Sequence, residues 1–234
     1  MQLFYNSEIT TSLTSFQFDK EESKHMIKVL RKKEGDTIFI TNGKGDLFEA
    51  TIKVESDRKC EIAITKTSKF EAKNYHLHIA IAPTKLNDRF EWFLEKATEI
   101  GINEITPIIC EHSERKVYKI DRAEKIIQSA MKQSNQYFLP KINEPISLNE
   151  FLKKDHTTEK FIAHCEEDQK DLLQKSIKAN QNILLLIGPE GDFSLKEIQL
   201  ALKNNFIPVS LGSNRLRTET AGIVGCHTVA LINE

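Results

Sequence analysis

The feature that most constrains the fold is an unbroken run of branched apolar residues, Ile183–Ile187, followed at once by the glycine-rich stretch Gly188–Gly191. A short strand this apolar is typical of a parallel sheet that helices cover on both faces. Glycine permits close approach to the backbone and proline fixes φ, so the strand is expected to end in a rigid, bare loop. Ser194 and Glu197 then have the spacing of a capping box at a helix start. Strand, loop and helix together predict a ligand site at the carboxyl end of the strand.

A second segment of the same kind follows. Phe206–Leu211 is predicted to be a buried strand, Gly212 ends it, and Thr218–Ile232 has apolar spacing compatible with a helix. Arg217 and Glu219 place two opposite charges beside the end of that strand. Neither loop has a Walker or G-x-G-x-x-G pattern, which argues against a phosphate cradle of either kind.

The composition is that of an ordinary globular protein, with 234 residues, 39% hydrophobic and 29% charged. A formal net charge of −1 gives no general attraction to nucleic acid, so RNA binding would need local basic patches. The four cysteines form no C-x-x-C pair, and no segment has the length of a membrane span or the pattern of a signal peptide. We therefore expect a cytoplasmic protein with reduced thiols and no membrane association.

Residues 1–72 are expected to form a small β-barrel. Strands are predicted at 37–41, 47–54 and 60–66, with the turn signal Asn42-Gly43-Lys44-Gly45 between the first two. One helix, Lys24–Asp36, interrupts them and carries a concentration of cations, although the segment as a whole has 12 Lys and Arg against 12 Asp and Glu. This helix is either a solvated face or a patch that contacts phosphates.

Residues 73–234 alternate between strand and helix patterns, which predicts an α/β domain with a mostly parallel sheet and helices on both faces. The expected strands are 75–82, 105–110, 161–164, 183–187 and 206–211, and the expected helices are 89–100, 121–134, 168–178, 195 onward and 218–232. His76 and His78 share a face of the first strand, but without a third ligand at motif spacing they are interpreted as structural, and no metal is expected.

Several motifs resemble one family. GPEGDFS at Gly188–Ser194 and LGSNRLRTETA at Leu211–Ala221 are similar to those of the bacterial family that methylates uridine N3 in 16S ribosomal RNA with S-adenosylmethionine, a branch of the SPOUT superfamily. KATEIG at Lys96–Gly101, SERK at Ser113–Lys116 and H-x-x-x-VLR from His25 to Arg31 extend the resemblance over nearly the whole chain. The resemblance implies a PUA-like RNA-binding barrel, a trefoil knot in the methyltransferase domain, and a homodimer that acts on 16S ribosomal RNA or the small ribosomal subunit.

The resemblance also implies site residues. RNA contacts are expected from His25, Arg31 and Arg115. Arg217 is expected to stabilise charge on the uracil carbonyls or to anchor a phosphate, while Glu219 orients Arg217, accepts a proton or caps its helix. S-adenosylmethionine is expected to be held largely by backbone groups and apolar walls of the two loops, from Leu186, Ile187, Gly188, Pro189, Glu190, Gly191, Leu211, Gly212, Leu216 and Thr220.

The chain departs from the family pattern at three positions. Asp192 stands in place of the second glycine of GPEGG, Asn214 in place of the first arginine of the second loop, and Gln136 in place of an arginine after Gln-Ser. Asp192 therefore needs a backbone shape that a residue with a side chain tolerates, and the neighbouring Arg215 is expected to take the place of the arginine missing at Asn214.

Two other functions compete with methyl transfer. The first is a non-catalytic RNA-binding assembly factor of the ribosome, with a vestigial methyltransferase domain. The second is a nucleotide-dependent enzyme that holds phosphates at the helix after GPEGDFS, which the acidic Glu190 and Asp192 disfavour.

Overall fold

The structure is a computed structural model, and it describes residues 2–156, 158–166 and 170–234. The chain divides into two compact units, Met1–Ala72 with Met131–Leu139, and Lys73–Ala130 with Pro140–Glu234. The predicted assignment of RNA binding to residues 1–72 and methyl transfer to residues 73–234 stays a prediction.

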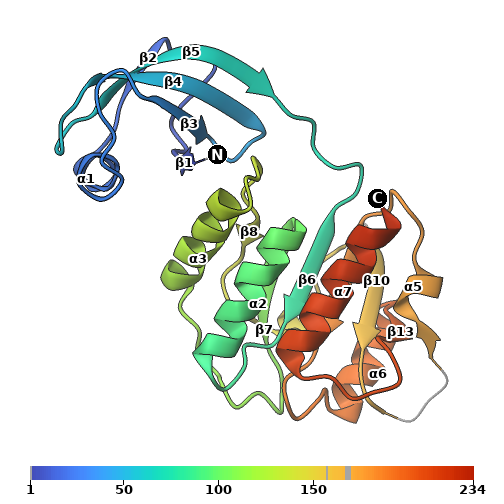
Figure 1. Ribbon diagram of the computed structural model, residues 1–234. Coiled ribbons are helices and arrows are strands. Elements are labelled where there is room, and N and C mark those ends of the chain that lie inside the picture. Colours follow the sequence, from blue (N-terminus) through green and yellow to red (C-terminus); the bar gives the residue numbers. More distant parts are fainter. Residues whose placement is uncertain (1, 157, 167–169) are drawn as a thin grey trace. The chain divides into compact units, whose positions relative to one another are not determined.

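The first unit is built on a curled five-stranded sheet (Figure 1). Its strands are β1 (Leu3–Tyr5), β2 (Ser15–Gln17), β3 (Thr37–Thr41), β4 (Asp46–Val54) and β5 (Glu61–Lys69), in the order β1-β3-β4-β5-β2. Only the β1–β3 pair is parallel among these strands. The alternation of Ile38, Phe48, Ile52 and similar residues fills one hydrophobic core, which confirms the β-rich prediction for this segment.

The predicted cationic helix differs from the structure in both its bounds and its type. α1 (Lys20–Lys24) begins earlier, at the N-cap Asp19, and continues as one π-helical turn, His25–Val29. The Leu30 N–H donates to the His25 carbonyl at 3.0 Å, and the chain then reverses at Arg31, which has a φ of 55°. The prediction that this helix extends to Asp36 was wrong, because the left-handed conformation of Arg31 ends the helical segment and directs the chain toward β3.

The second unit is a sheet whose strands all run parallel in the described part of the chain. The strand order is β11-β13-β10-β12-β6-β7-β8, and β9 also pairs with β7. The strands are β6 (Leu77–Ile81), β7 (Glu104–Ile109), β8 (Lys141–Ile142), β9 (Ile146–Ser147), β10 (Glu159–Ala163), β11 (Asp171–Leu172), β12 (Ile183–Ile187) and β13 (Ile207–Ser210). The carboxyl ends of these strands therefore meet at one edge, as predicted for an α/β domain.

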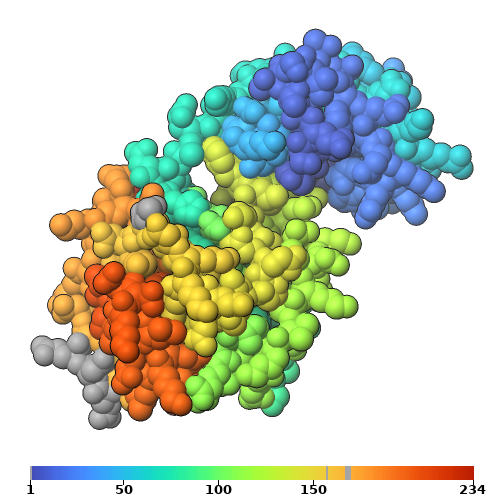
Figure 2. All heavy atoms as spheres, turned by 180° about the vertical axis from the view of Figure 1, so that it is seen from behind, coloured from blue at the N-terminus to red at the C-terminus, as the bar shows by residue number. Residues whose placement is uncertain are grey.

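Helices cover both faces of this sheet. α2 (Asn87–Ile100) and α7 (Thr218–Ile232) lie side by side on one face (Figure 1). α4 (Leu148–Leu152) and α6 (Leu195–Lys203) pack on the other face, and Figure 2 gives the surface of the molecule seen from behind. Gly222 permits the close approach of α7, because a Cβ there would lie 2.6 Å from the Phe93 ring. The predicted bounds of α7 and the capping box of Ser194 and Glu197 are confirmed. The remaining helices are α3 (Ile120–Gln133) and α5 (Leu173–Ser176).

Two predictions for this unit were wrong. The helix expected at 168–178 begins outside the described residues, and its described part is the two-residue strand β11 followed by the single turn α5. The strand expected to be buried at 206–211 is β13, in which Ile207 is exposed and Val209 is buried. The reason is that β13 lies near the edge of the sheet, where only the short β11 pairs with its outer side.

No helix within the described ranges is long and apolar enough to span a bilayer. The trefoil knot implied by the family resemblance stays a prediction.

Candidate functional site

The loop Gly188–Asp192 leaves the carboxyl end of the fully buried strand β12. Gly188 and Gly191 in this loop do not have a positive φ, and it is close packing that favours glycine at these two positions. A Cβ on Gly188 would lie 3.1 Å from the Phe193 ring, and one on Gly191 would lie 3.0 Å from the Cβ of His112. Both glycines therefore pack closely against a neighbour, which an added methyl group would have to displace by a few tenths of an ångström.

The left-handed residue of this loop is Asp192, with a φ of 63°. Its carboxylate accepts two backbone hydrogen bonds, from Phe193 N–H to Oδ1 and from Cys165 N–H to Oδ2, each 2.8 Å long. Aspartate tolerates this conformation because its short side chain can bond locally to the backbone. Asp192 thus ties the loop to the chain that follows β10.

The second loop runs from the end of β13 to the start of α7. Gly212 has a φ of 143°, and the Ser210 hydroxyl bonds to both its N–H and its carbonyl. Two contacts join this loop to the first: the buried Thr218 hydroxyl donates to the Gly188 carbonyl at 3.0 Å, and the Arg215 guanidinium lies 3.4 Å from the Glu190 carbonyl. The structure therefore brings the two glycine-containing segments side by side, as the sequence predicted.

Two adjoining cavities of about 250 and 410 Å³ lie between the loops and the end of β10. Both are lined by Ala163, Cys165, Arg215, Leu216 and Ala221. The smaller one is also lined by Ile187, Gly188, Pro189, Glu190, Asp192, Arg217 and Thr218, and the larger one by His164, Glu166, Lys170, Val209, Ser210, Leu211, Gly212, Ser213 and Asn214. This is the position at which open parallel sheets bind ligands.

Seven of the ten residues expected to bind the cofactor line these cavities, and three do not. Leu186 points to the opposite face of the sheet and belongs to the core that α4 and α6 cover. It alternates with Ile187, which lines the smaller cavity. Gly191 packs against His112, and Thr220 is half-buried in the first turns of α7 without lining either cavity.

The two residues expected to be catalytic do not contact each other. Arg217 is the exposed N-cap residue of α7 and lines the smaller cavity. Glu219 is 7% exposed, and its Oε1 lies 3.8 Å from Nε of Arg89 on α2. Its Oε2 is buried and has no hydrogen-bond partner among the described residues. Glu219 is therefore directed toward α2 and does not line either cavity.

The residues expected to contact RNA lie in different settings. His25 opens the π-helical turn, 3.8 Å from the Glu22 carboxylate, and Arg31 is exposed in the turn that follows. Arg115 is half-buried, and its guanidinium donates to the carbonyls of Thr84 and Lys85.

Sequence reasoning missed the contribution of β10 to the site. Ala163 and Cys165 line both cavities. The signal was available, because the carboxyl end of any neighbouring parallel strand reaches the same edge. Burial, followed by the charge of Asp192, raises the pKa of the Cys165 thiol, so this cysteine is not an activated nucleophile.

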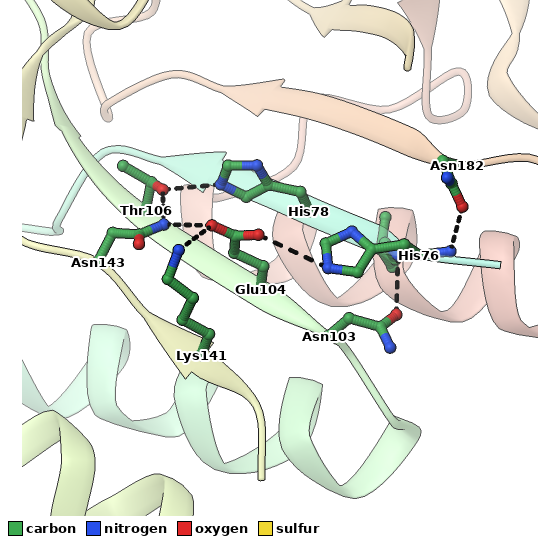
Figure 3. A network of polar contacts seen from close by, with 9 residues as sticks. His76, His78, Asn103, Glu104, Thr106, Lys141, Asn143 and Asn182 are labelled. Atoms are coloured by element: carbon green, nitrogen blue, oxygen red, sulfur yellow. Dashed lines mark hydrogen bonds and ion pairs between the residues drawn. The ribbon is translucent and has the colours of Figure 1, made fainter. Parts of the chain in front are cut away.

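The two histidines at the start of β6 belong to a polar network at the amino ends of the strands (Figure 3). The His78 ring and the Asn143 amide each lie 2.7 Å from the Thr106 hydroxyl, and Asn143 also donates to Glu104. Burial is the main cause that lowers the pKa of His78 to about 4. Within the described part of the chain, no group of three or more His, Cys, Asp or Glu side chains is placed to hold a metal.

Comparisons with known proteins give the family. A model described as an RNA methyltransferase domain matches residues 71–230, and one described as an RNA methyltransferase PUA domain matches residues 18–65. The chain is 33% identical over 225 residues to a ribosomal RNA small subunit methyltransferase E of Buchnera aphidicola, covering 91% of this chain and 86% of that protein.

Solved structures agree with this assignment. The fold matches a protein described as a probable rRNA methyltransferase from Porphyromonas gingivalis, at a TM-score of 0.92 and 37% identity, covering 100% of this chain and 98% of that one. It also matches a ribosomal RNA small subunit methyltransferase E from Neisseria gonorrhoeae bound to S-adenosyl methionine, at a TM-score of 0.89 and 25% identity, covering 100% and 98%. The chain therefore belongs to the family of RNA methyltransferases that includes the ribosomal RNA small subunit methyltransferases E.

Proposed function

We propose that this protein methylates ribosomal RNA of the small subunit, and that it transfers the methyl group from S-adenosylmethionine to N3 of a uridine in 16S ribosomal RNA. The observation that carries the proposal is the pair of joined loops at the carboxyl edge of the sheet, with adjoining cavities between them. The names of the relatives support the ribosomal substrate, and the ligand of the Neisseria structure supports the cofactor.

The residues at the cavities fit this cofactor. Apolar side chains from Ile187, Leu216 and Ala221 suit an adenine ring, and the backbone of Gly188–Glu190 and Leu211–Gly212 offers hydrogen-bonding groups for ribose and adenine. The Arg215 guanidinium lines both cavities and the carboxylates of Glu190 and Asp192 line the smaller one, which suits a ligand with a charged amino-acid tail. When bound, S-adenosylmethionine supplies a methyl group already activated by its positively charged sulfur.

The chain's own residues have the remaining tasks of orienting the base and compensating charge. A uracil N3–H must lose its proton before the nitrogen can attack, and negative charge then spreads to the carbonyl oxygens. Arg217, exposed at the smaller cavity, is proposed to stabilise that charge. Because Glu219 contacts Arg89 and not Arg217, its proposed role is to anchor the first turn of α7 to α2.

The proposal extends to partners. We propose that His25 and Arg31 contact RNA phosphates, that the protein acts as a homodimer, and that it works in the cytoplasm, where ribosomal subunits are assembled. Arg31 is exposed in a turn, as a phosphate contact requires.

The decisive experiment maps modified nucleotides by mass spectrometry in ribosomal RNA from cells with and without this protein. The expected result is the loss of one N3-methyluridine from the small-subunit RNA. Calorimetry with S-adenosylmethionine is a second measurement, because a vestigial domain would give no heat of binding. Unchanged methylation together with absent binding would support the assembly-factor alternative.

A further inference from the structure

The loop after β7, residues 110–116, holds the two loops that follow β6 and β12. Arg115 extends toward the loop after β6, where its Nε donates to the Thr84 carbonyl at 3.1 Å and a terminal nitrogen donates to the Lys85 carbonyl at 2.7 Å. Thr84 is fully buried. The planar guanidinium thus binds two consecutive carbonyls through two of its nitrogens, whose relative positions are fixed.

The loop held by Arg115 is bound directly to the proposed cofactor site. The Lys85 N–H donates to Oε1 of Glu190 at 2.9 Å, and Glu190 lines the smaller cavity. The Lys85 side chain, in turn, forms an ion pair of 2.7 Å with Glu114, the neighbour of Arg115. The two loops after β6 and β7 are therefore held together by hydrogen bonds and an ion pair. Glu190 is held to the first of these loops by its hydrogen bond from the Lys85 N–H.

The same β7 loop contacts the Gly188–Asp192 loop a second time. Nδ1 of His112 lies 3.1 Å from the carbonyl oxygens of both Gly191 and Asp192. Because carbonyl oxygens only accept, Nδ1 carries the hydrogen in this arrangement. The loop that forms one wall of the smaller cavity is thus fixed at Glu190 through Lys85 and at Gly191 and Asp192 through His112.

We propose that Arg115 is a positioning residue for the methyl-donor pocket, acting through Lys85 and Glu190, and that this is its main role in place of the RNA contact suggested by sequence resemblance. The inference rests on the proposed function, since it takes the smaller cavity as part of the cofactor site. Loops lack the hydrogen-bond ladders of helices and strands, so a bound ligand requires them to be fixed beforehand by contacts of this kind.

A positioning role and an RNA-contacting role for Arg115 predict different effects on the affinity for S-adenosylmethionine alone. A positioning residue affects cofactor binding when no RNA is present, whereas an RNA contact affects only the affinity for RNA. Arg115→Ala and Arg115→Lys are therefore titrated calorimetrically with S-adenosylmethionine alone, and their RNA affinity is measured separately. Arg122→Ala is the matched control, because the Arg122 side chain is 73% exposed and pairs with Glu91 on α2, and it has no hydrogen bond or ion pair to either loop among the described residues.

The expected result is a dissociation constant for S-adenosylmethionine that rises about tenfold or more in Arg115→Ala, since misplaced binding groups commonly cost that much. Arg115→Lys keeps the charge and loses the paired geometry, so its loss is smaller but measurable. Arg122→Ala binds as the parent protein does. In Glu190→Ala, which removes the acceptor of the Lys85 N–H, the further effect of Arg115→Ala shrinks, because two residues that act through one contact are not additive.

Two other outcomes are distinguishable. If the parent protein binds S-adenosylmethionine and both Arg115 variants bind it equally well, the positioning role is wrong, and lost RNA affinity in the same variants would assign Arg115 to RNA. If the parent protein itself does not bind S-adenosylmethionine, the proposed function fails, whatever Arg115 does. Amide exchange at Lys85, faster in Arg115→Ala than in Arg122→Ala, reports the contacts between these loops without any ligand.

Discussion

Asp192 permits a test that separates backbone strain from hydrogen bonding in the loop after β12. Its left-handed conformation, with a φ of 63°, costs an ordinary side chain about 1–2 kcal/mol but costs glycine nothing. Its carboxylate accepts backbone hydrogen bonds from Cys165 and Phe193. Hydrogen bonds to a charged group contribute about 1.5–3 kcal/mol each, and the half-exposed setting places both at or below the lower end.

Three substitutions follow from these magnitudes. Asp192→Ala keeps a Cβ in the left-handed region and loses both hydrogen bonds, so the free energy of unfolding falls by about 2–3 kcal/mol. Asp192→Gly loses the same bonds but has no strain, so it is about 1 kcal/mol more stable than the alanine variant. Asp192→Asn tolerates the conformation and keeps an acceptor oxygen, so it loses least.

Differential scanning calorimetry without ligand measures the series. For a protein of this size each kcal/mol shifts the Tm by about 2–4 °C, so the alanine variant melts about 4–12 °C below the parent protein. The order expected is parent, Asn, Gly, Ala. Equal melting temperatures for the glycine and alanine variants would falsify the strain argument, and a parent-like alanine variant would show that the carboxylate bonds contribute nothing.

The remaining predictions address the site, the core and the response to pH. Arg217→Ala lowers the rate of methyl transfer by about 100-fold or more, because it removes a group proposed to stabilise charge on the uracil. Calorimetry on the same variant is expected to give a nearly unchanged dissociation constant for S-adenosylmethionine, and normal turnover would contradict the proposed role of Arg217. Thr218→Val leaves the Gly188 carbonyl without its buried donor and costs about 1–3 kcal/mol in denaturant unfolding, whereas Thr218→Ser keeps the hydroxyl and stays close to the parent protein. Gly222→Ala places a methyl group 2.6 Å from the Phe93 ring and costs about 1–3 kcal/mol, in contrast to Thr228→Ala on the same helix, which is expected to be nearly neutral. The pKa of His78 is lowered from 6.5 to about 4, so its contribution to stability is complete above the unfolded pKa, decreases as the pH falls below that value and is lost once the pH has fallen through about 4. Urea titrations at pH 7 and pH 5 should therefore show a loss of about 1–2 kcal/mol that His78→Gln abolishes.

The sequence was most informative where one pattern admits one structure. The run Ile183–Ile187 could only be a buried strand once Gly188 and Pro189 ended it, and the Ser194 and Glu197 spacing defined the next helix start. The proximity of the two loops also followed, because the carboxyl ends of parallel strands share an edge. The same reasoning applied to β10 would have added Ala163 and Cys165 to the site.

Other features could not be read from the pattern because they depend on contacts between distant residues. Leu186 and Ile187 are equally apolar, and only the register of β12 against β6 and β10 decides which one reaches the cavity. The pairing of Glu219 with Arg89 depends on how α7 lies against α2, which no local spacing encodes. Lys24–Asp36 read as a continuous helix because left-handed Arg31 carries no glycine or proline signal.

The uniform strand direction has a practical consequence for experiments on this protein. His76 and Lys141 are largely exposed at the amino edge, whereas the loops proposed to hold the ligands leave the carboxyl edge. In a protein whose exposed Cys165 is replaced by serine, a fluorescent dye attached to a cysteine introduced at Lys141 would therefore report unfolding from the edge opposite the proposed cofactor site. Such a labelled protein would allow folding and binding to be followed in one sample, each from its own end of the strands.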